Sequence, residues 1–224
     1  MSLRSPFAIF VLTKKTDMPK SILFALLLLV ATTAYGRRTI DTYFISAPTQ
    51  LLPQLDANNR KDLIDLFDAG LESRITGPLG GNIEIGSIDD RQITVHFSPA
   101  STVQIALLPT ADTVGVIAVI HTVDLPAPDS RITFYDTQWN PIENDELFIA
   151  PTPETFLGKG PKKEKRQAAG LIDLLPLSYT IEGDTLLARE SLQEYLPEEV
   201  YNRIASLLGK EPVTYTWNGK RFTR

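Results

Sequence analysis

The stretch from Val114 to Val123 reads VGVIAVIHTV and is apolar at most of its positions. A strand with one face in water alternates apolar and polar residues, whereas a strand covered on both faces is apolar at consecutive positions. The run is also short for a helix that would be buried on all sides. We therefore predict a central strand in a sheet that is covered on both faces.

Runs on both sides of this stretch predict an antiparallel meander. NIEIGSI, RQITVHF and TVQIALL precede it across short polar turns, and SRITFYD and TQWNPI follow it as a hairpin. Within RQITVHF, Ile93, Val95 and Phe97 share one face of the strand, and Thr94 and His96 share the other. Short turns between consecutive strands favour antiparallel pairing.

Helical periodicity occurs on both sides of these strands. Residues 55–75, LDANNRKDLIDLFDAGLESRI, predict an amphipathic helix, and so do residues 196–212, LPEEVYNRIASLLGKEP. The apolar stripe of the first helix is Leu63, Ile64, Phe67, Leu71 and Ile75, and that of the second is Val200, Ile204, Leu207 and Leu208. VTYTWNGKRFTR then predicts a closing hairpin with a two-residue turn at Asn218-Gly219. Its Val213, Tyr215 and Trp217 are expected to pack on the preceding helix.

The fold class expected from these elements is α+β: a mainly antiparallel meander with an N-terminal and a C-terminal amphipathic helix and a closing β-hairpin. We expect residues 1–36 to be a leader and signal peptide and residues 37–150 to form the first helix with the meander. Residues 151–170 are a connection rich in proline and lysine. Residues 171–224 form hairpins and a helix, packed on the same core.

The leader predicts export. MPKSILFALLLLVATTAYGRR starts at Met18, and its apolar run from Ile22 to Ala31 has the length of a signal-peptide core and is too short to span a bilayer. Ala34 and Gly36 fit the small-residue pattern of a cleavage site, so we place cleavage after Gly36. The expected location is the periplasm or the cell surface, with no span left after cleavage.

Composition excludes several kinds of chemistry. The chain has no cysteine, and its two methionines, Met1 and Met18, both precede the cleavage site, so disulfides and thiolate catalysis are excluded from the mature chain. The net charge is −5, and the leader carries +3 (Arg4, Lys14, Lys15 and Lys20 against Asp17), which leaves −8. Such an acidic chain repels nucleic acid and anionic lipid.

The basic segment KGPKKEKR, Lys159–Arg166, interrupts this acidic chain. It could dock an acidic partner, but short runs of charge are typical of solvated, mobile loops. We therefore expect a mobile loop here, and it is also the best candidate for a boundary between subdomains.

DSRITFYDTQWNPI, residues 129–142, concentrates polar and aromatic side chains. A turn at Asp136, Thr137 and Gln138 explains most of them, because a short acidic side chain in a turn accepts hydrogen bonds from nearby backbone N–H groups. The functional interpretation makes this stretch an interaction surface. Its candidate residues are Arg131, Tyr135, Asp136 and Trp139.

No catalytic, cofactor-binding or metal site is predicted. Neighbouring strands could bring His96 and His121 together, but no third ligand is spaced beside either one, and transition-metal sites need three or four ligands. No G-x-S-x-G motif is present. Acidic residues are plentiful, so a carboxylate pair of the glycosidase kind stays open.

Four stretches occur here in a recognisable order: NNRKDLIDLFDAG, FSPASTVQIALLP, DSRITFYDTQWNPI and the closing hairpin. In these stretches the chain resembles a family of small exported proteins of Gram-negative bacteria, domain of unknown function number three-two-five-six. The resemblance covers nearly all of the mature chain and implies export and a single architecture. That family has no assigned activity, so no mechanism carries over.

The function expected from the sequence is that of an uncharacterised exported protein, a non-enzymatic periplasmic or cell-surface binding domain. Its partner would be an envelope protein or a glycan. The alternative is a hydrolase of glycans or peptides that uses carboxylates. A hydrolase requires two acidic side chains about 5–10 Å apart in a concave pocket, whereas a binding domain requires an exposed patch without that pair.

Overall fold

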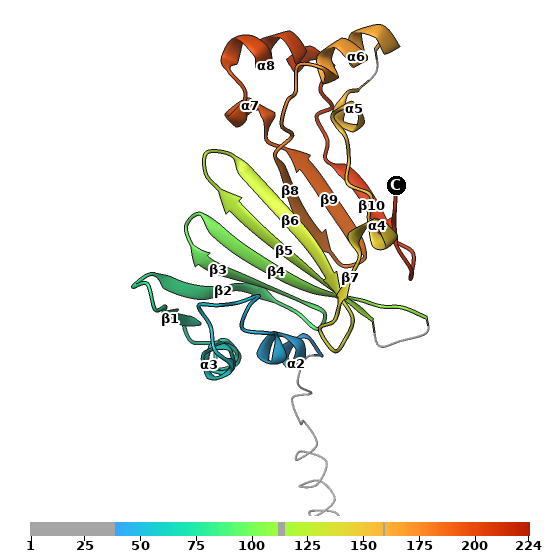
Figure 1. Cartoon of the computed structure of the whole chain (residues 1–224). Helices are drawn as coiled ribbons and strands as arrows, with labels where there is room; N and C mark the ends of the chain where they lie inside the picture. Colours follow the sequence, from blue (N-terminus) through green and yellow to red (C-terminus); the bar gives the residue numbers. More distant parts are fainter. Residues whose placement is uncertain (1–38, 112–114, 159) are drawn as a thin grey trace, which may run out of the picture. The chain divides into compact units, whose positions relative to one another are not determined.

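Seven consecutive strands form an antiparallel sheet within the described part of the chain, in the order β1-β2-β3-β4-β5-β6-β7 (Figure 1). We refer to it as the first sheet. Its strands are β1 (Arg74–Thr76), β2 (Asn82–Ile88), β3 (Gln92–Ser98), β4 (Ser101–Leu108), β5 (Val116–Asp124), β6 (Pro128–Tyr135) and β7 (Pro141–Ile142). The computed structural model describes residues 39–111, 115–158 and 160–224, so the predicted leader lies outside the described residues.

Residues 116–123 of the apolar stretch predicted as the central strand lie in β5, which pairs with β4 and β6 along its length. Val116 to Ile120 are all buried, on both faces of the strand. The predicted interior strand and the α+β fold with an antiparallel meander are confirmed.

Two helices cover one face of the first sheet. These are α2 (Thr39–Ser46), which the sequence pattern does not predict, and α3 (Ala57–Asp68). Ile40, Phe44 and Leu63 from the helices pack with Ile93 and Val95 of β3 in one core cluster. The buried Arg60 of α3 donates to the carbonyl oxygens of Phe44 and Ala47, and thereby ties the two helices together.

The helix predicted over residues 55–75 is shorter than expected. Asp56 is its N-cap and accepts a hydrogen bond from the backbone N–H of Asn59 at 2.8 Å. The chain leaves the helix before Gly70, whose φ of +67° suits glycine and is costly for other residues. The predicted stripe is therefore wrong at its end: Leu71 is 61% exposed, and Ile75 lies in β1.

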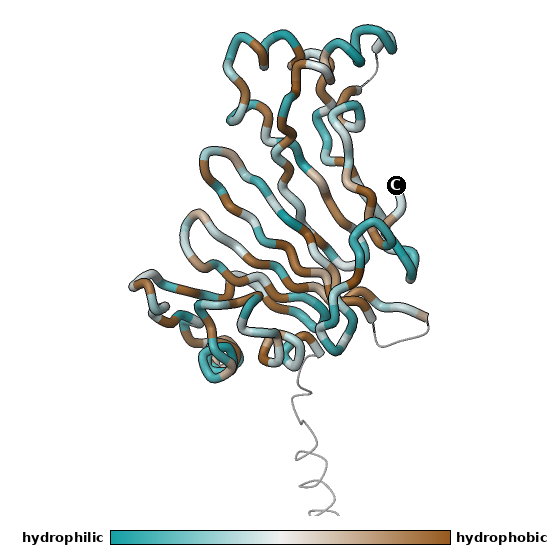
Figure 2. The backbone as a smooth tube through the Cα atoms, viewed as in Figure 1, coloured by the Kyte–Doolittle hydropathy of each residue, from teal (hydrophilic) through white to brown (hydrophobic). Residues whose placement is uncertain are grey.

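A second sheet covers part of the other face. Its order is β11-β10-β9-β8, and its strands are β8 (Leu177–Glu182), β9 (Thr185–Glu190), β10 (Val213–Trp217) and β11 (Phe222–Thr223). Leu177, Leu186 and Phe222 of this sheet share a core cluster with Ile132 and Phe134 of β6. Figure 2 shows apolar residues recurring along the strands of both sheets.

The closing hairpin differs from the prediction in its turn and in its packing. Trp217 pairs with Phe222, so the loop has four residues instead of two. The Asn218 side chain accepts from the backbone N–H groups of Lys220 and Arg221, which stabilises the longer loop. Val213, Tyr215 and Trp217 pack in the core between the sheets, and not on the preceding helix, because that core offers more apolar surface.

Short helices lie between the two sheets along the chain and between β9 and β10 of the second sheet. They are α4 (Asn144–Leu147), α5 (Pro153–Phe156), α6 (Lys162–Ala169), α7 (Leu192–Tyr195) and α8 (Glu198–Ile204), which continues as the 3-10 turn η1 (Ala205–Leu207). Ala168 and Ala169 of α6 are buried in a small cluster with Ile204 of α8 and Leu192 of α7.

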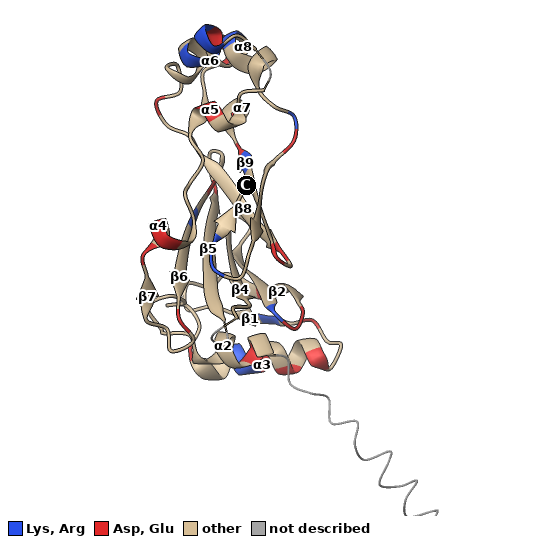
Figure 3. Cartoon of the chain, turned by 90° about the vertical axis from the view of Figure 1, so that its right-hand side faces the viewer, with Lys and Arg blue, Asp and Glu red and all other residues tan. Residues whose placement is uncertain are grey.

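Residues 162–166 of the basic segment are therefore helical, and the expectation of a loop is wrong for these residues. Lysine, glutamate, arginine, glutamine and alanine are all good helix formers, and two buried alanines hold the helix on its neighbours. Figure 3 shows basic residues gathered on α6.

Polar side chains of the first sheet bind the edge of the second. β8 is an edge strand, so one row of its backbone groups has no strand partner. The Gln104 side chain accepts from the Ile181 N–H at 2.8 Å and donates to the Ile181 carbonyl at 2.9 Å. Asp129 and Ser130 accept from the N–H groups further along β8, each at 3.1 Å.

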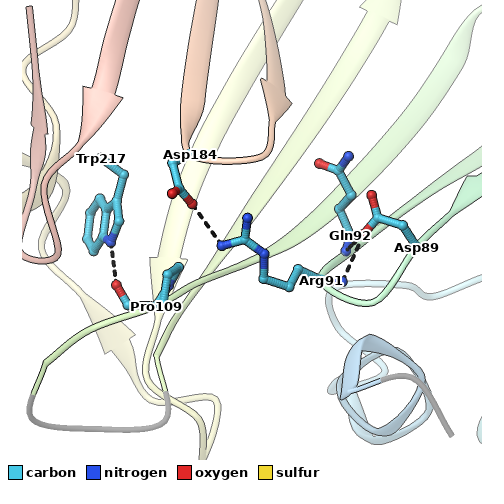
Figure 4. Close-up of polar contacts among 6 residues, drawn as sticks. All are labelled: Asp89, Arg91, Gln92, Pro109, Asp184 and Trp217. Atoms are coloured by element: carbon cyan, nitrogen blue, oxygen red, sulfur yellow. Dashed lines mark hydrogen bonds and ion pairs between the residues drawn. The ribbon is translucent and has the colours of Figure 1, made fainter. Parts of the chain in front are cut away.

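Two further contacts join the turn regions of the sheets (Figure 4). Arg91 forms an ion pair with Asp184 at 2.8 Å, and the backbone of Arg91 is held by the Asp89 carboxylate. Trp217 Nε1 donates to the Pro109 carbonyl at 2.6 Å. Both contacts connect residues of the meander to residues beyond position 170.

Candidate functional site

A row of polar side chains crosses six strands of the first sheet on the face away from α2 and α3. Each member is the register partner of the next, so the side chains lie side by side on one face. We call it the polar row; its members, from β1 to β6, are Arg74, Glu84, His96, Thr102, Thr122 and Ser130.

Hydrogen bonds link neighbours along the polar row. Arg74 Nε donates to Glu84 Oε2 at 2.9 Å, and His96 Nδ1 lies 3.2 Å from Thr102 Oγ1. Further along, the hydroxyl oxygens of Thr122 and Ser130 are 2.8 Å apart. The row ends against β8, because Ser130 Oγ also accepts from a backbone N–H of that strand.

Gly86 makes room for the imidazole of His96. A Cβ atom on Gly86 would lie 2.3 Å from His96 Nε2 and 2.7 Å from its Cδ2, closer than non-bonded atoms can approach. The ring therefore occupies the space above the glycine backbone. His96 is held there between Gly86 on β2 and the Thr102 hydroxyl on β4.

Two hollows open onto the polar row. One has a volume of about 270 Å³ and is lined by hydroxyl and amide groups that include Thr94, Thr102, Gln104 and Thr180. The other, of about 490 Å³, is lined by Arg74, Asn82, Glu84, His96, Ser98 and Pro99.

Most of the residues that line the smaller hollow have uncharged polar side chains. Tyr179 belongs to its lining, and burial raises the pKa of Tyr179, with the charges of Tyr215 and Asp129 adding to the rise. The phenol therefore stays protonated and neutral. Asp124 is the one carboxylate in that lining, and Glu84 is the one carboxylate in the other. Hydroxyl and amide groups can donate and accept hydrogen bonds, so the site suits a ligand with many hydroxyl or amide groups.

The candidate residue Asp136 lies in a turn. Its Oδ1 accepts from the N–H groups of Gln138 at 2.8 Å and Asn140 at 2.9 Å, and its Oδ2 accepts from Asn140 Nδ2 at 2.8 Å. These hydrogen bonds, those from Asn140 above all, hold the pKa of Asp136 below its ordinary value. The predicted turn geometry is thus present around this side chain.

The other three residues of the predicted interaction surface, Arg131, Tyr135 and Trp139, lie on two separate parts of the first sheet. Trp139 stacks at a tilt on Tyr135, with ring centroids 5.6 Å apart, and its Nε1 donates to Ser46 Oγ at 3.3 Å. Arg131 pairs in register with His121. The structure therefore brings Tyr135, Asp136 and Trp139 together at the turn, while Arg131 lies further along β6. Their role as an interaction surface stays a prediction.

The two histidines point to opposite faces of the first sheet. His96 lies in register with Thr102 and Thr122, whereas His121 is the neighbour of Thr122 in sequence and so faces the other way. Within the described ranges, no group of three or more His, Cys, Asp or Glu side chains is arranged to hold a metal ion. In the same ranges no helix has the length and apolar character needed to cross a membrane.

Only part of the polar row can be predicted from the sequence. Alternation on β3 places Thr94 and His96 on one face, and this is visible in RQITVHF. The row itself depends on the register of five strand pairs, which a single sequence does not specify.

Comparisons with known proteins agree with the fold. The family model described as "Protein of unknown function (DUF3256)" matches residues 33–222. No curated protein matches the chain. A solved structure described as "Structure of a domain of an uncharacterized protein from Porphyromonas gingivalis W83" is 27% identical, with a TM-score of 0.72, over 83% of this chain and 97% of that one. The resemblance stated from the sequence is confirmed.

Proposed function

Because the chain belongs to the DUF3256 family of proteins of unknown function, we propose a function from the chemistry of the site. The protein is a non-enzymatic binding domain of the cell envelope, and the polar row with its two hollows holds the ligand. The ligand class is a neutral, polyhydroxylated molecule, an envelope glycan.

The observation that carries this proposal is the composition of the polar row. The side chains of Thr102, Thr122 and Ser130 are half-buried, and those of Thr102 and Thr122 line the smaller hollow, where they meet solvent. Preorganised hydroxyl groups lose little freedom when a ligand binds, which favours affinity. The neighbouring Gln104 amide is fixed by its two hydrogen bonds to Ile181.

The alternative of a carboxylate-dependent hydrolase has less support. A glycosidase places two carboxyl groups about 5–10 Å apart across the scissile bond. Each hollow on the polar row has a single carboxylate in its lining, Glu84 in one and Asp124 in the other. Glu84 is also engaged in an ion pair with Arg74 at 2.8 Å.

Export is part of the proposal, and the sequence supports it. The apolar run of residues 22–31 after a basic flank has the form of a signal peptide. A chain without cysteine can fold in an oxidising compartment without mispaired disulfides.

The test is binding of the tagged protein, recovered from cells that express the full chain, to an array of neutral and acidic oligosaccharides. We expect retention on neutral oligosaccharides. The double variant Thr102→Val and Thr122→Val removes two hydroxyl groups with little change in shape, and each lost hydrogen bond should weaken binding by about 0.5–1.5 kcal/mol.

Thr214→Val is the matched control, because Thr214 is an exposed threonine on β10 outside both hollows. It should bind as the unchanged protein does. An array without bound protein, or equal binding by the double variant, would refute the assignment of the polar row. Release of reducing sugar from any oligosaccharide on the array would favour the hydrolase instead.

A further inference from the structure

A third hollow lies at the closing hairpin, apart from the polar row. Its volume is about 540 Å³, and it lies between residues 149–155 and the β10–β11 hairpin. Arg221 and Arg224 line it together with Tyr215 and hydroxyl groups that include Thr152. None of its lining residues belongs to the polar row.

The charged side chains that line this hollow are of one sign. Its lining includes two guanidinium groups and no aspartate or glutamate, in a chain whose net charge is −5. Neither arginine forms an ion pair with any residue that the structure describes. Arg224 is close enough to Tyr215 that its charge opposes the rise in the pKa of Tyr215 that burial causes. Two cationic side chains without an acidic side-chain partner favour an anion between them.

The backbone fixes the position of Arg221 more firmly than that of Arg224. The Asn218 carboxamide accepts from the Arg221 N–H at 2.9 Å, and the next residue, Phe222, is buried in the core. The Arg221 side chain is half-buried, whereas Arg224 is exposed. Arg221 is therefore the residue on which binding should depend most.

Apolar surface adjoins the two cations. Ile149 belongs to the lining and is 63% exposed, and Phe222 lies beneath with its ring against Trp217 at 5.2 Å between centroids. An exposed isoleucine beside guanidinium groups favours a ligand that has an apolar or ring-shaped body as well as a charge.

Another hollow with two arginines is less suited to an anion. It measures about 620 Å³ and includes Arg166 and Arg203, but Glu164 shares its lining. Both arginines also lie in the last turns of α6 and α8, where they neutralise the negative end of the helix dipole. The field of those helix ends opposes an anion, and the hollow at the closing hairpin has no such opposition.

We infer that the hollow at the closing hairpin binds an oxyanion, carboxylate or phosphate, carried on a sugar-sized body, with Arg221 as its main contact. This site is separate from the one in the proposed function. An acidic sugar is the simplest ligand with the required charge, size and ring.

The test is titration of the tagged protein, recovered from cells that express the full chain, with glucuronate, glucose 6-phosphate and glucose, followed by NMR. We expect shifts of residues around Arg221 and Phe222 with at least one of the two anions and none with glucose. Binding of glucuronate would identify the oxyanion as a carboxylate, and binding of glucose 6-phosphate would identify it as a phosphate. Higher salt should weaken the binding. Shifts with glucose alone, or with none of the three, would overturn the inference.

Arg221→Gln should weaken binding on the order of ten-fold, since a charge-assisted hydrogen bond is lost. Lys220→Gln is the matched control, because it removes the same charge from the neighbouring residue, which does not line the hollow. Equal weakening by both variants would show a diffuse charge effect and refute the site. If Arg221→Gln folds poorly by circular dichroism, Arg224→Gln replaces it, and unchanged binding then counts against the inference.

The double variant at Thr102 and Thr122 separates this inference from the proposed function. It should leave the titration with the anions unchanged. Loss of anion binding in that variant would mean that the two sites are one, and the separate site would be wrong.

Discussion

At the scale of single residues, Gly86 decides where His96 can lie. The imidazole fills the space that a side chain at position 86 would need, since a Cβ there would be 2.3 Å from Nε2. His96 is half-buried, so its ring can turn toward solvent and make room for a Cβ atom at position 86. A neighbouring backbone atom in the same place could not move away in this manner. The glycine therefore controls the shape of the polar row more than the stability of the sheet.

We predict that Gly86→Ala displaces the His96 ring and breaks its hydrogen bond to Thr102. The free energy of unfolding should fall by less than about 1 kcal/mol, the usual range for a change that a flexible side chain can accommodate. The ring proton signals of His96 should move in the NMR spectrum, and urea unfolding gives the stability.

Gly115→Ala is the informative comparison. Gly115 has a φ of +149°, and a Cβ there would lie 2.7 Å from the Leu108 carbonyl oxygen, which belongs to the backbone of β4. Its replacement should cost about 1–3 kcal/mol, because neither the strain nor the clash can be relieved by a side chain. A larger loss of stability from Gly86→Ala than from Gly115→Ala would contradict this account.

His121 makes the free energy of unfolding decrease as the pH is lowered. Burial lowers the pKa of His121 below its ordinary value of 6.5, and the positive charge of Arg131 lowers it further. The unfolded chain therefore binds a proton more readily than the folded chain does. It follows that this group reduces stability as the pH falls below 6.5.

We predict that the free energy of unfolding, measured in urea across this range, declines as the pH is lowered below 6.5. His121→Gln should remove this part of the decline, and Arg131→Gln should reduce it, because one of the two causes of the shift is gone. His96→Gln serves as the control for the loss of a histidine. If the slope is the same with and without His121, the group does not contribute in the way described.

At the scale of elements, the junction of the two sheets depends on a buried amide more than on a surface ion pair. Gln104 is 9% exposed and satisfies both backbone groups of Ile181. The ion pair of Arg91 and Asp184 in Figure 4 has side chains that are 41% and 51% exposed. Exposed pairs contribute about 0–1 kcal/mol, whereas a buried polar group left without a partner costs about 1–3 kcal/mol.

Gln104→Leu should therefore lower the free energy of unfolding by about 1–3 kcal/mol, and Arg91→Gln by less than about 1 kcal/mol. Urea unfolding followed by far-UV circular dichroism measures both. High salt should reduce the effect of Arg91→Gln and leave that of Gln104→Leu unchanged. The reverse order of the two variants would show that the ion pair, and not the amide, holds the junction.

Strands were easier to predict from the sequence than helices. A strand that is buried on one or both faces is visible in its own residues, so β2 to β6 were predicted close to their observed bounds. The end of α3 was misplaced because Leu71 and Ile75 continue the apolar spacing beyond Gly70, where the backbone turns. α2 was not predicted because eight residues give too short a periodic signal, and its buried residues pack against strands that are distant in sequence.

At the scale of the whole molecule, the candidate sites could not be predicted, since both depend on contacts distant in sequence. The polar row combines residues from position 74 to position 130, and the anion hollow combines residues near 150 with residues near 220. A single sequence gives the residue types and not the register that aligns them. The turn at Asp136 is the opposite case, because all its partners lie within four residues.

The proposed export predicts a defined N-terminus. Cleavage after Gly36 leaves Arg37 as the first residue of the mature chain, so N-terminal sequencing of protein recovered from the envelope fraction should begin with Arg-Arg-Thr. A cytosolic protein that keeps residues 1–36 would contradict the proposed location. Replacement of Leu27 and Leu28 by arginine should block processing, because it interrupts the apolar run.

The last prediction concerns whether the two sheets unfold together. Residues of β6 and of the second sheet share one core, and the Gln104 and Trp217 contacts cross the same junction. A shared core of this kind favours a single cooperative transition. The chain has two tryptophans: Trp139 lies beside the first sheet, and Trp217 lies in the second sheet at the junction, so their fluorescence reports on two different places in the fold.

In Trp139→Phe the remaining fluorescence comes from Trp217, and in Trp217→Phe it comes from Trp139. Within each variant, the urea midpoint from fluorescence should equal the midpoint from circular dichroism at 222 nm, which follows the whole chain. Both midpoints are measured on the same variant. A loss of stability caused by the substitution itself, such as the lost hydrogen bond from Trp217 to Pro109, therefore lowers both midpoints together. Separate midpoints in either variant would mean that the sheets unfold independently, and the core between them would then be an interface between two domains.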